Sequence, residues 1–426
     1  MINFNSEEDG TKRSFLGGIG RVLSHRQFRL LWWSNGIHSL GAWLFKVAVG
    51  WWTWELTHST YWLGVIAFAH TFPLVIMSIF AGVWADKIGY RRVMILSQAP
   101  LVLAGILMTA LAFSNLLDLF SIVILTTVVG VADAVTTPPR LSMVHDLVPS
   151  RDLSAAISLN SVTYNVSRMV GPAIAGALIV WLNLSSVIAL AALSFVIFFA
   201  ALFFLDETKN KNDFQKKSNM IRDLFEGFKY SWNHPEIRFI LILLSVTALL
   251  IRPYIDLLPG ISEQFYNAGP EGLSMLLAAT GVGATVCGVW LTQRGRNQGL
   301  TQIYVLSFLL SGIAIILFAI SDILWIGVII AGFAGFFIIC GAISGQTLIQ
   351  IVVDSRVRAR VISIQVMLSW GLPAIGALIL GGIADYVGLQ ITLAAGGLLT
   401  ALLWIWASNK GRQMTSSFER KQSHAD

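Results

Sequence analysis

The chain has 426 residues, of which 55% are hydrophobic and only 12% are charged, with a net charge of +6 at pH 7. Soluble globular proteins carry about 25% charged residues, so the composition indicates a membrane protein. The two cysteines exclude a disulfide-stapled fold, and no Cys/His cluster has the spacing of a metal site. A basic net charge can indicate nucleic-acid binding, but it also arises when positive loops orient a membrane protein.

The sequence predicts an all-α membrane protein. A helix needs about 20 mainly apolar residues to cross the hydrocarbon core of a bilayer. The chain contains twelve such runs, which we expect to be membrane-spanning helices, at residues 28–54, 60–84, 92–113, 117–139, 155–180, 183–205, 237–258, 271–292, 300–320, 322–346, 359–383 and 388–408. An even number of spans places both termini on the same side.

The positions of the positive charges indicate which side that is. Of the 29 Lys and Arg residues, 26 lie in the terminal segments and in the loops after the even-numbered spans. None lies in the opposite loops, which are those near Glu55, Asp118, Trp181, Glu263, Asp322 and Asp385. By the positive-inside rule both termini are expected to be cytoplasmic. We therefore attribute the basic balance to orientation in the bilayer and expect no nucleic-acid partner.

A polar segment, residues 206–236, divides the spans six and six. Its part from Ile221 to Trp232 has apolar residues at helical spacing, which predicts an amphipathic helix on the membrane surface, the alternative being a simple tether. The segments 171–179 (GPAIAGALI) and 372–379 (LPAIGALI) are alike, as expected for two pseudo-twofold-related six-helix bundles. The predicted organisation is an N-terminal cytoplasmic segment, a bundle, a linker, a second bundle and a cytoplasmic tail, at residues 1–27, 28–205, 206–236, 237–408 and 409–426.

The loop between the second and third spans carries a motif. It reads GVWADKIGYRR and contains Gly82, Asp86, Gly89, Arg91 and Arg92. In pattern and position it resembles the G-x-x-x-D-x-x-G-x-R-R loop of the major facilitator superfamily, which implies that these residues form a latch holding the two halves in one state. The glycines permit close helix approach and a tight turn, and the aspartate can cap a helix or pair with an arginine. The corresponding loop after the eighth span, VWLTQRGRNQG, lacks the acid.

Three further stretches, residues 51–68, 146–179 and 252–265, resemble the branch of this superfamily that includes the enterobactin exporter and drug-proton antiporters. The resemblance covers roughly residues 28 to 408 and implies a multi-pass protein of the bacterial inner membrane. It implies export of a small molecule, a siderophore or an amphipathic drug-like compound, by proton antiport. The energy source would be the proton gradient rather than a cofactor, and we expect a monomer. The alternatives are import by proton symport and a non-transporting receptor or scaffold; an enzyme is not expected.

Ionisable groups inside a span cost about 2.5 to 3.5 kcal/mol on insertion scales, so each indicates a candidate functional site. Five lie well inside the expected spans: Lys46, Asp133, Arg168, Arg252 and Asp256. Asp133 and Arg168 lie in consecutive spans and could form a pair whose carboxylate gains and loses a proton. A permanent structural salt bridge between them is the alternative.

The other three charges suggest a gate or a substrate contact. Arg252 and Asp256 are four residues apart and share a helical face beside Pro253, which indicates an outer gate or a local ion pair. Lys46 is expected to pair with an acid such as Glu55 or Asp256, or to meet an anionic substrate. Three cations against two acids favour an anionic or zwitterionic cargo.

Overall fold

The computed structural model describes residues 17–207, 220–295, 298–354 and 356–422, and within these ranges every regular element is helical. The N-terminal half consists of α1 (Gly17–Ser24), α2 (Arg26–Thr57), α3 (Thr60–Thr71), α4 (Pro73–Ile88), α5 (Tyr90–Phe113), α6 (Leu119–Leu147), α7 (Leu153–Trp181) and α8 (Leu184–Phe203). The C-terminal half consists of α9 (Met220–Asn233), α10 (Pro235–Val246), α11 (Leu258–Tyr266), α12 (Gly269–Arg294), α13 (Leu300–Ala319), α14 (Leu324–Val352), α15 (Arg358–Val387) and α16 (Leu389–Gln422).

The helices account for the predicted spans. Among the described residues, ten segments are long and apolar enough to cross a membrane, counting α3 with the start of α4 as one and α10 with the turns after it as another. The helices α2 and α7 are more polar than these ten segments, but at 32 and 29 residues they are also long enough to cross a membrane. Both pack among the spanning helices, so each of the twelve predicted runs has a helical counterpart.

Two predicted spans are broken helices. The second breaks between α3 and α4 at Pro73, whose nitrogen has no hydrogen to donate to the preceding turn. In the seventh, α10 is followed by a π-helical turn at Thr247–Ile251, a 3₁₀ turn at Arg252–Ile255 and then α11. The seventh span was predicted to end at residue 258, but α11 continues to Tyr266. π-Helical turns and discontinuous membrane helices are frequent at functional sites.

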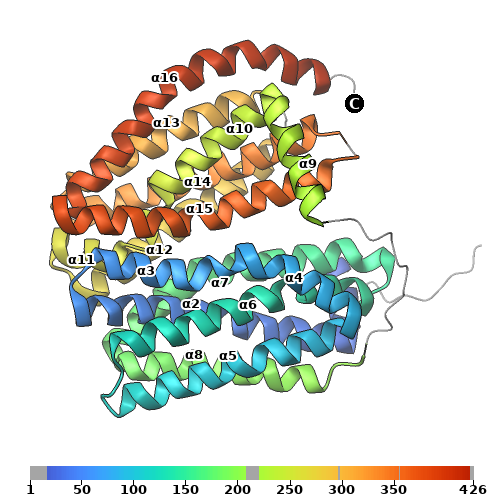
Figure 1. Ribbon diagram of the computed structural model, residues 1–426, viewed down its shortest axis with the longest axis vertical. Helices are drawn as coiled ribbons and strands as arrows, with labels where there is room; N and C mark the ends of the chain where they lie inside the picture. The colour runs from blue at the N-terminus through green and yellow to red at the C-terminus, as the bar shows by residue number, and fades with distance from the viewer. Residues whose placement is uncertain (1–16, 208–219, 296–297, 355, 423–426) are drawn as a thin grey trace, which may run out of the picture.

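The two halves form separate bundles lying side by side, with their spanning helices running in roughly the same direction (Figure 1). Within the first bundle α2 packs on α7 and α8, and α5 packs on α6 and α8. Within the second, α14 packs on α12 and α13, and α13 packs on α16. The contacts between the bundles are made mainly by α3 with α15 and by α7 with α12.

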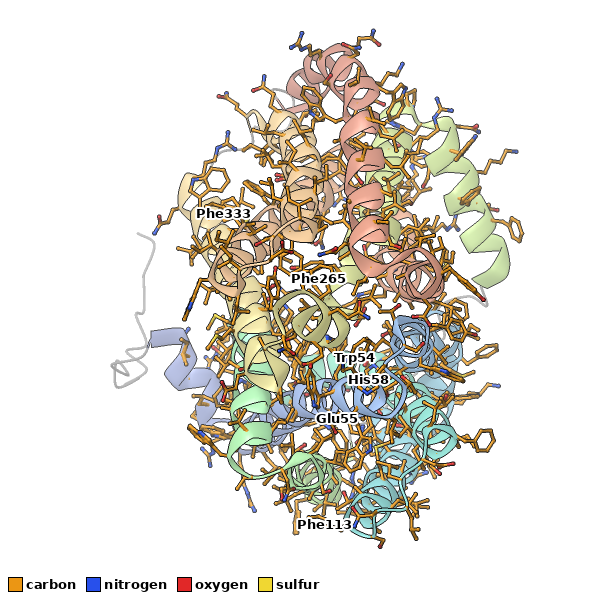
Figure 2. All side chains as sticks on the ribbon, turned by 90° about the vertical axis from the view of Figure 1, so that its left-hand side faces the viewer. Trp54, Glu55, His58, Phe113, Phe265 and Phe333 are labelled. Atoms are coloured by element: carbon orange, nitrogen blue, oxygen red, sulfur yellow. The ribbon has the colours of Figure 1, made fainter. Side chains whose placement is uncertain are left out.

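The two ends of the molecule differ in charge. One end, here called the basic end, carries Arg21, Arg91, Arg151, Arg294 and Arg360, together with α9 and the described end of α16. The other, here called the acidic end, carries the turns around Glu55, Asp118, Glu263, Asp322 and Asp385. Figure 2 looks onto the acidic end, where Trp54, Glu55 and His58 lie at the boundary between the bundles, near Phe265 of α11.

The hydrophobic core shows that the halves meet at the acidic end. One continuous cluster there joins residues of both bundles, including Phe45, Ile122 and Phe195 of the first and Tyr254 and Phe318 of the second. Towards the basic end the core of the described residues divides into three clusters, one in the second bundle and two in the first. Burial of apolar side chains is the main favourable term in packing, so the bundles are held together at the acidic end.

Glycines allow the helices of the two halves to approach closely near the acidic end. A Cβ atom added to Gly64 of α3 would lie within 2.3 Å of the carbonyl oxygen of Ala377 of α15. One added to Gly176 of α7 would lie within 2.1 Å of the Ser274 side chain of α12. Small residues at such positions let helix backbones touch within a membrane.

The linker contains α9, whose aromatic side chains Phe225, Phe228 and Trp232 are 72%, 56% and 54% exposed. They lie three and four residues apart, on one face of the helix. The opposite side is held to the second bundle, where Glu226 forms an ion pair with Arg360 of α15 at 2.7 Å. The predicted apolar residue Ile221 lies outside the side chains that are described. This geometry fits the amphipathic helix predicted at the membrane surface.

Candidate functional site

Two charges inside the bundles form an ion pair between the halves. Lys46 Nζ of α2 lies 2.8 Å from Asp256 Oδ1, just after the 3₁₀ turn of the seventh span. Lys46 also lies over the ring of Trp43, 5.5 Å from its centroid. A carboxylate and an aromatic face both attract an ammonium group, so they hold the half-buried Lys46 side chain in place. Asp256 was one of the two partners predicted for Lys46, and the other, Glu55, accepts a hydrogen bond from Trp51 instead.

The pair between Lys46 and Asp256 borders a small cavity at the acidic end. The cavity has a volume of about 50 Å³ and is lined by side chains of both bundles, including His70, Thr126 and Leu273. A space of this size holds water molecules rather than a drug-sized ligand. The acidic end is therefore closed around the ion pair.

The predicted local pair between Arg252 and Asp256 does not form. The four-residue spacing would align the two side chains on a regular α-helix, but Arg252–Ile255 is a 3₁₀ turn that follows a π-helical turn. Arg252 instead donates a hydrogen bond from Nη1 to the carbonyl oxygen of Ser369 in α15, at 2.6 Å. Because the helix is broken here, the two side chains have different partners. Arg252 bonds to a backbone carbonyl of its own bundle, and Asp256 pairs with Lys46 of the other bundle.

The predicted pair between Asp133 and Arg168 does not form either. Asp133 of α6 lies 3.4 Å from His38 Nε2 of α2, and His38 is almost completely buried. The nearby Arg140 donates to the side chain of Asn35 at 3.0 Å. Consecutive helices in the chain need not face each other, and α6 packs mainly on α3, α4 and α5. Asp133 is nevertheless 33% exposed, so its carboxylate is accessible from outside the protein.

Arg168 makes no hydrogen bond or ion pair with any side chain that is described, and no carboxylate of those residues lies within 4.0 Å of it. It lies near the middle of α7, and its charge repels that of Arg252 from the other bundle. Tyr164, one turn earlier, lies among most of the central charges. Those within electrostatic range of it are Lys46, Asp133, Arg140, Arg168 and Arg252.

A polar stripe runs along α7 from the basic end to this region. Ser154, Ser158, Ser161 and Asn165 are exposed, and Arg168 is half-buried. Their spacing of four, three, four and three residues places them on one face of the helix. This polar face of α7 is a candidate lining for a path between the basic end and Arg168.

The latch motif lies at the basic end. Gly89 ends α4 with φ of 92°, a backbone conformation that favours glycine. Arg91 donates to the carbonyl oxygens of Leu202 and Phe203, which end α8, and Arg92 pairs with Glu207 at 2.9 Å. Both arginines thus fasten the start of α5 to the end of α8 within the first bundle.

The motif has two further members, Gly82 and Asp86, and both lie on α4. A Cβ atom added to Gly82 would meet no atom of the described residues within 4 Å, so nothing in that part of the chain requires a glycine there. Asp86 lies on α4, but its side chain is outside those that are described.

Three residues of this region were not among the predicted site residues. Nothing in the local sequence around His38 or Tyr164 marks either residue. The packing of α2, α6 and α7 places both beside the central charges. Asp385 was read only as a residue of an outer loop, but it bonds to Ser59 and Thr60 of the other half. Its signal was present in the sequence, because residues 381–388 (GGIADYVG) repeat the pattern of residues 82–89 (GVWADKIG).

Comparison with known proteins places the chain among transporters. The family model described as "Transmembrane secretion effector" matches residues 21–423. The Staphyloferrin A transporter of Staphylococcus aureus (strain NCTC 8325 / PS 47) is 25% identical over 366 residues, 85% of this chain and 90% of that protein. Macrolide efflux protein A of Streptococcus pyogenes is 23% identical, over 68% of this chain and 72% of its own. The crystal structure of the nucleoside transporter NupG is similar in fold, with a TM-score of 0.72 at 12% identity, over 90% of this chain and 99% of that one.

The family match extends over almost all of the chain, and the fold is that of the solved transporter. Two helical bundles that meet at one end, around a region of unlike charges, agree with this assignment. The chain belongs to the transmembrane secretion effector family of the major facilitator superfamily, and is a multi-pass membrane transporter rather than an enzyme.

Proposed function

We propose that this transporter exports a small anionic molecule from the cytoplasm in exchange for protons. The observation that carries the choice of cargo is the position of Arg168 and Arg252. They come from different bundles, their charges repel each other, and no described carboxylate lies within 4.0 Å of either. A ligand with carboxylate or phosphate groups between them would offset that repulsion, since guanidinium groups bind such anions through paired hydrogen bonds.

The remaining charges of the region support the same cargo. Lys46 is neutralised by Asp256, and Arg140 donates to the side chain of Asn35 in electrostatic range of Asp133. Among the five charges predicted inside the spans, Arg168 and Arg252 are then the cations that remain for a ligand. A carboxylate siderophore has this chemistry, and the Staphyloferrin A transporter is similar to this chain over most of its length. A cationic drug would meet the two guanidinium groups as like charges.

The direction of transport is inferred from the family and from the closed end. The family model is described as a secretion effector, and macrolide efflux protein A is among the relatives. The positive-inside rule assigns the basic end and both termini to the cytoplasm of a bacterial cell. The acidic end, where the halves meet, would then face outwards, and the polar stripe of α7 would lead from the cytoplasm to Arg168.

Proton coupling is assigned to Asp133. Its carboxylate is partly exposed and lies 3.4 Å from a buried histidine. A carboxylate in such a position can bind a proton in one state of the cycle and release it in the other, because its surroundings change as the halves rock. The energy for export would come from the inward proton gradient.

The cargo site is tested by removing each guanidinium in turn. Arg168→Gln and Arg252→Gln are each expected to raise the KM for an iron-free citrate-based siderophore about tenfold or more, because each removes a charged hydrogen-bond donor. Transport is measured as substrate-driven proton movement in inside-out vesicles. Lys410→Gln, which removes one positive charge from α16 near the basic end, is the matched control. An unchanged KM in both arginine variants would contradict an anion site between them.

A further inference from the structure

The acidic end contains a second copy of the latch motif. Residues 82–89 read GVWADKIG and residues 381–388 read GGIADYVG, so Gly, Ala, Asp and Gly recur at the same spacing. The two copies also share a backbone conformation. Gly89 has φ 92° and ψ 147°, and Gly388 has φ 93° and ψ 146°. Each glycine donates its N–H to the carbonyl oxygen four residues earlier, at 2.9 Å.

The copy at the acidic end joins the two bundles. Asp385 of α15 accepts a hydrogen bond from the backbone N–H of Thr60, at 2.7 Å. Its other oxygen accepts from the hydroxyl of Ser59, at 2.5 Å. The Thr60 hydroxyl lies 2.6 Å from Asp385 and 2.9 Å from the carbonyl oxygen of Gly381. A carboxylate of the second bundle therefore caps the N-terminus of α3 in the first.

This arrangement is electrostatically favourable. The first N–H groups of a helix have no partner within it and carry partial positive charge, so an acidic cap stabilises a helix start. Hydrogen bonds to a charged acceptor are about twice as strong as those between neutral groups. Here the cap and the helix belong to different bundles, so the stabilisation acts on the closed acidic end.

The first glycine of each copy has different surroundings in the described part of the chain. A Cβ atom added to Gly381 would lie 2.3 Å from the carbonyl oxygen of Thr60, so the contact with α3 requires glycine there. The same test at Gly82, in the basic-end copy, finds no atom of the described residues within 4 Å. Among those residues, the first glycine of the motif therefore touches the other bundle at the acidic end, whereas the space beside its counterpart at the basic end is open.

We propose that residues 381–388 are a second latch, which holds the acidic end shut through Asp385 and must release before that end opens. The basic-end motif and this copy would engage in turn as the bundles rock. Asp385 acts here as a positioning residue for transport, without touching the cargo. The proposal depends on the transporter fold and not on the nature of the cargo or on proton coupling.

The latch is tested by measuring the distance between the bundles at the acidic end. Spin labels are attached at Leu116→Cys in the first bundle and Ile323→Cys in the second, two positions that are 68% and 58% exposed. The background carries Cys287→Ala and Cys340→Ala, which remove the two buried native thiols. Asp385→Ala is expected to raise the ratio of open to closed acidic ends about tenfold or more in pulsed electron resonance, because charged hydrogen bonds are lost.

Asp118→Asn is the matched control, since it removes one carboxylate charge at the same end. Asp118 caps α6 by accepting from the N–H of Ser121, within one bundle, and asparagine is an equally good cap. A distance distribution for Asp385→Ala that equals those of the parent and of this control would overturn the latch.

A double variant keeps the test decisive if Asp385→Ala does not fold. Ser59→Ala with Thr60→Val removes two hydroxyl donors to the carboxylate and leaves the backbone N–H of residue 60 in place. The same shift towards longer distances is expected, but smaller. No shift in this variant would equally overturn the proposal.

Discussion

At the scale of single residues, the contact between Asp133 and His38 carries the proposed proton coupling. Asp133→Asn keeps the size of the side chain and its capacity to hydrogen bond, but it cannot bind and release a proton. We expect the variant to lose cargo-driven proton release completely while its thermal stability stays within a few degrees of the parent's. The measurement is a pH-sensitive dye in vesicles, beside a thermal melt of the purified protein.

Asp118→Asn serves again as the control, because its side chain caps α6 outside the membrane-spanning part. Full proton release by Asp133→Asn would remove this residue from the coupling mechanism. A loss in both variants would indicate a general effect of lost charge at the membrane.

The sequence predicts which residues belong to the charged region but not which partners they contact. The cost of a charge in lipid identifies Lys46, Asp133, Arg168, Arg252 and Asp256 from the sequence alone. The partners depend on the rotation of each helix about its axis, which no local pattern fixes. Lys46 reaches one of its two predicted acids, Asp256, whereas Asp133 contacts a histidine from a helix that is distant in the chain.

At the scale of elements, the N-terminal helix α1 is fastened by one buried carboxylate. Asp152, between α6 and α7, is 1% exposed and lies 3.2 Å from both His25 Nε2 and Arg21 Nε. The hydrogen bond from His25 is the main cause that lowers the pKa of Asp152; burial opposes this effect and Arg21 adds to it. The ionised carboxylate is therefore the form that holds α1.

A lowered pKa sets the direction of the pH effect. Stability from such a group is present above the ordinary pKa of aspartate, about 3.9, and is lost as the pH falls through the lowered value. We expect α1 to stay docked throughout the neutral range and to detach only in acid. Asp152→Asn should detach it at pH 7, seen as faster hydrogen exchange in residues 17–24. Unchanged exchange in that variant would show that apolar contacts alone hold α1.

The elements were predictable where hydropathy and proline act locally. The twelve apolar runs follow from the chain itself, and Pro253 lies where the seventh span changes to a 3₁₀ turn. The π-helical turn at Thr247–Ile251 and the extension to Tyr266 do not, because they depend on packing against α15 and α12. The shift of Arg252 away from Asp256 is a consequence of that packing.

At the scale of the whole molecule, the halves share one core at the acidic end and have separate cores at the basic end, which is the arrangement expected of one state of the proposed cycle. The sequence predicted two related bundles from the linker and from the paired segments 171–179 and 372–379. It could not predict which end is closed, because that depends on how the two bundles are tilted against each other, which no local pattern fixes. The contact at Gly381 and the open space at Gly82 provide that information.

The most direct test of the whole account is proton movement in acidified inside-out vesicles that contain the purified protein. An iron-free citrate-based siderophore and a cationic dye are added in separate experiments, with protein-free vesicles as the background. We predict that the siderophore causes proton release and that the dye does not, because Arg168 and Arg252 favour an anion. Proton release with the dye alone would contradict the anionic cargo, and no release with either would contradict proton-coupled export of these compounds.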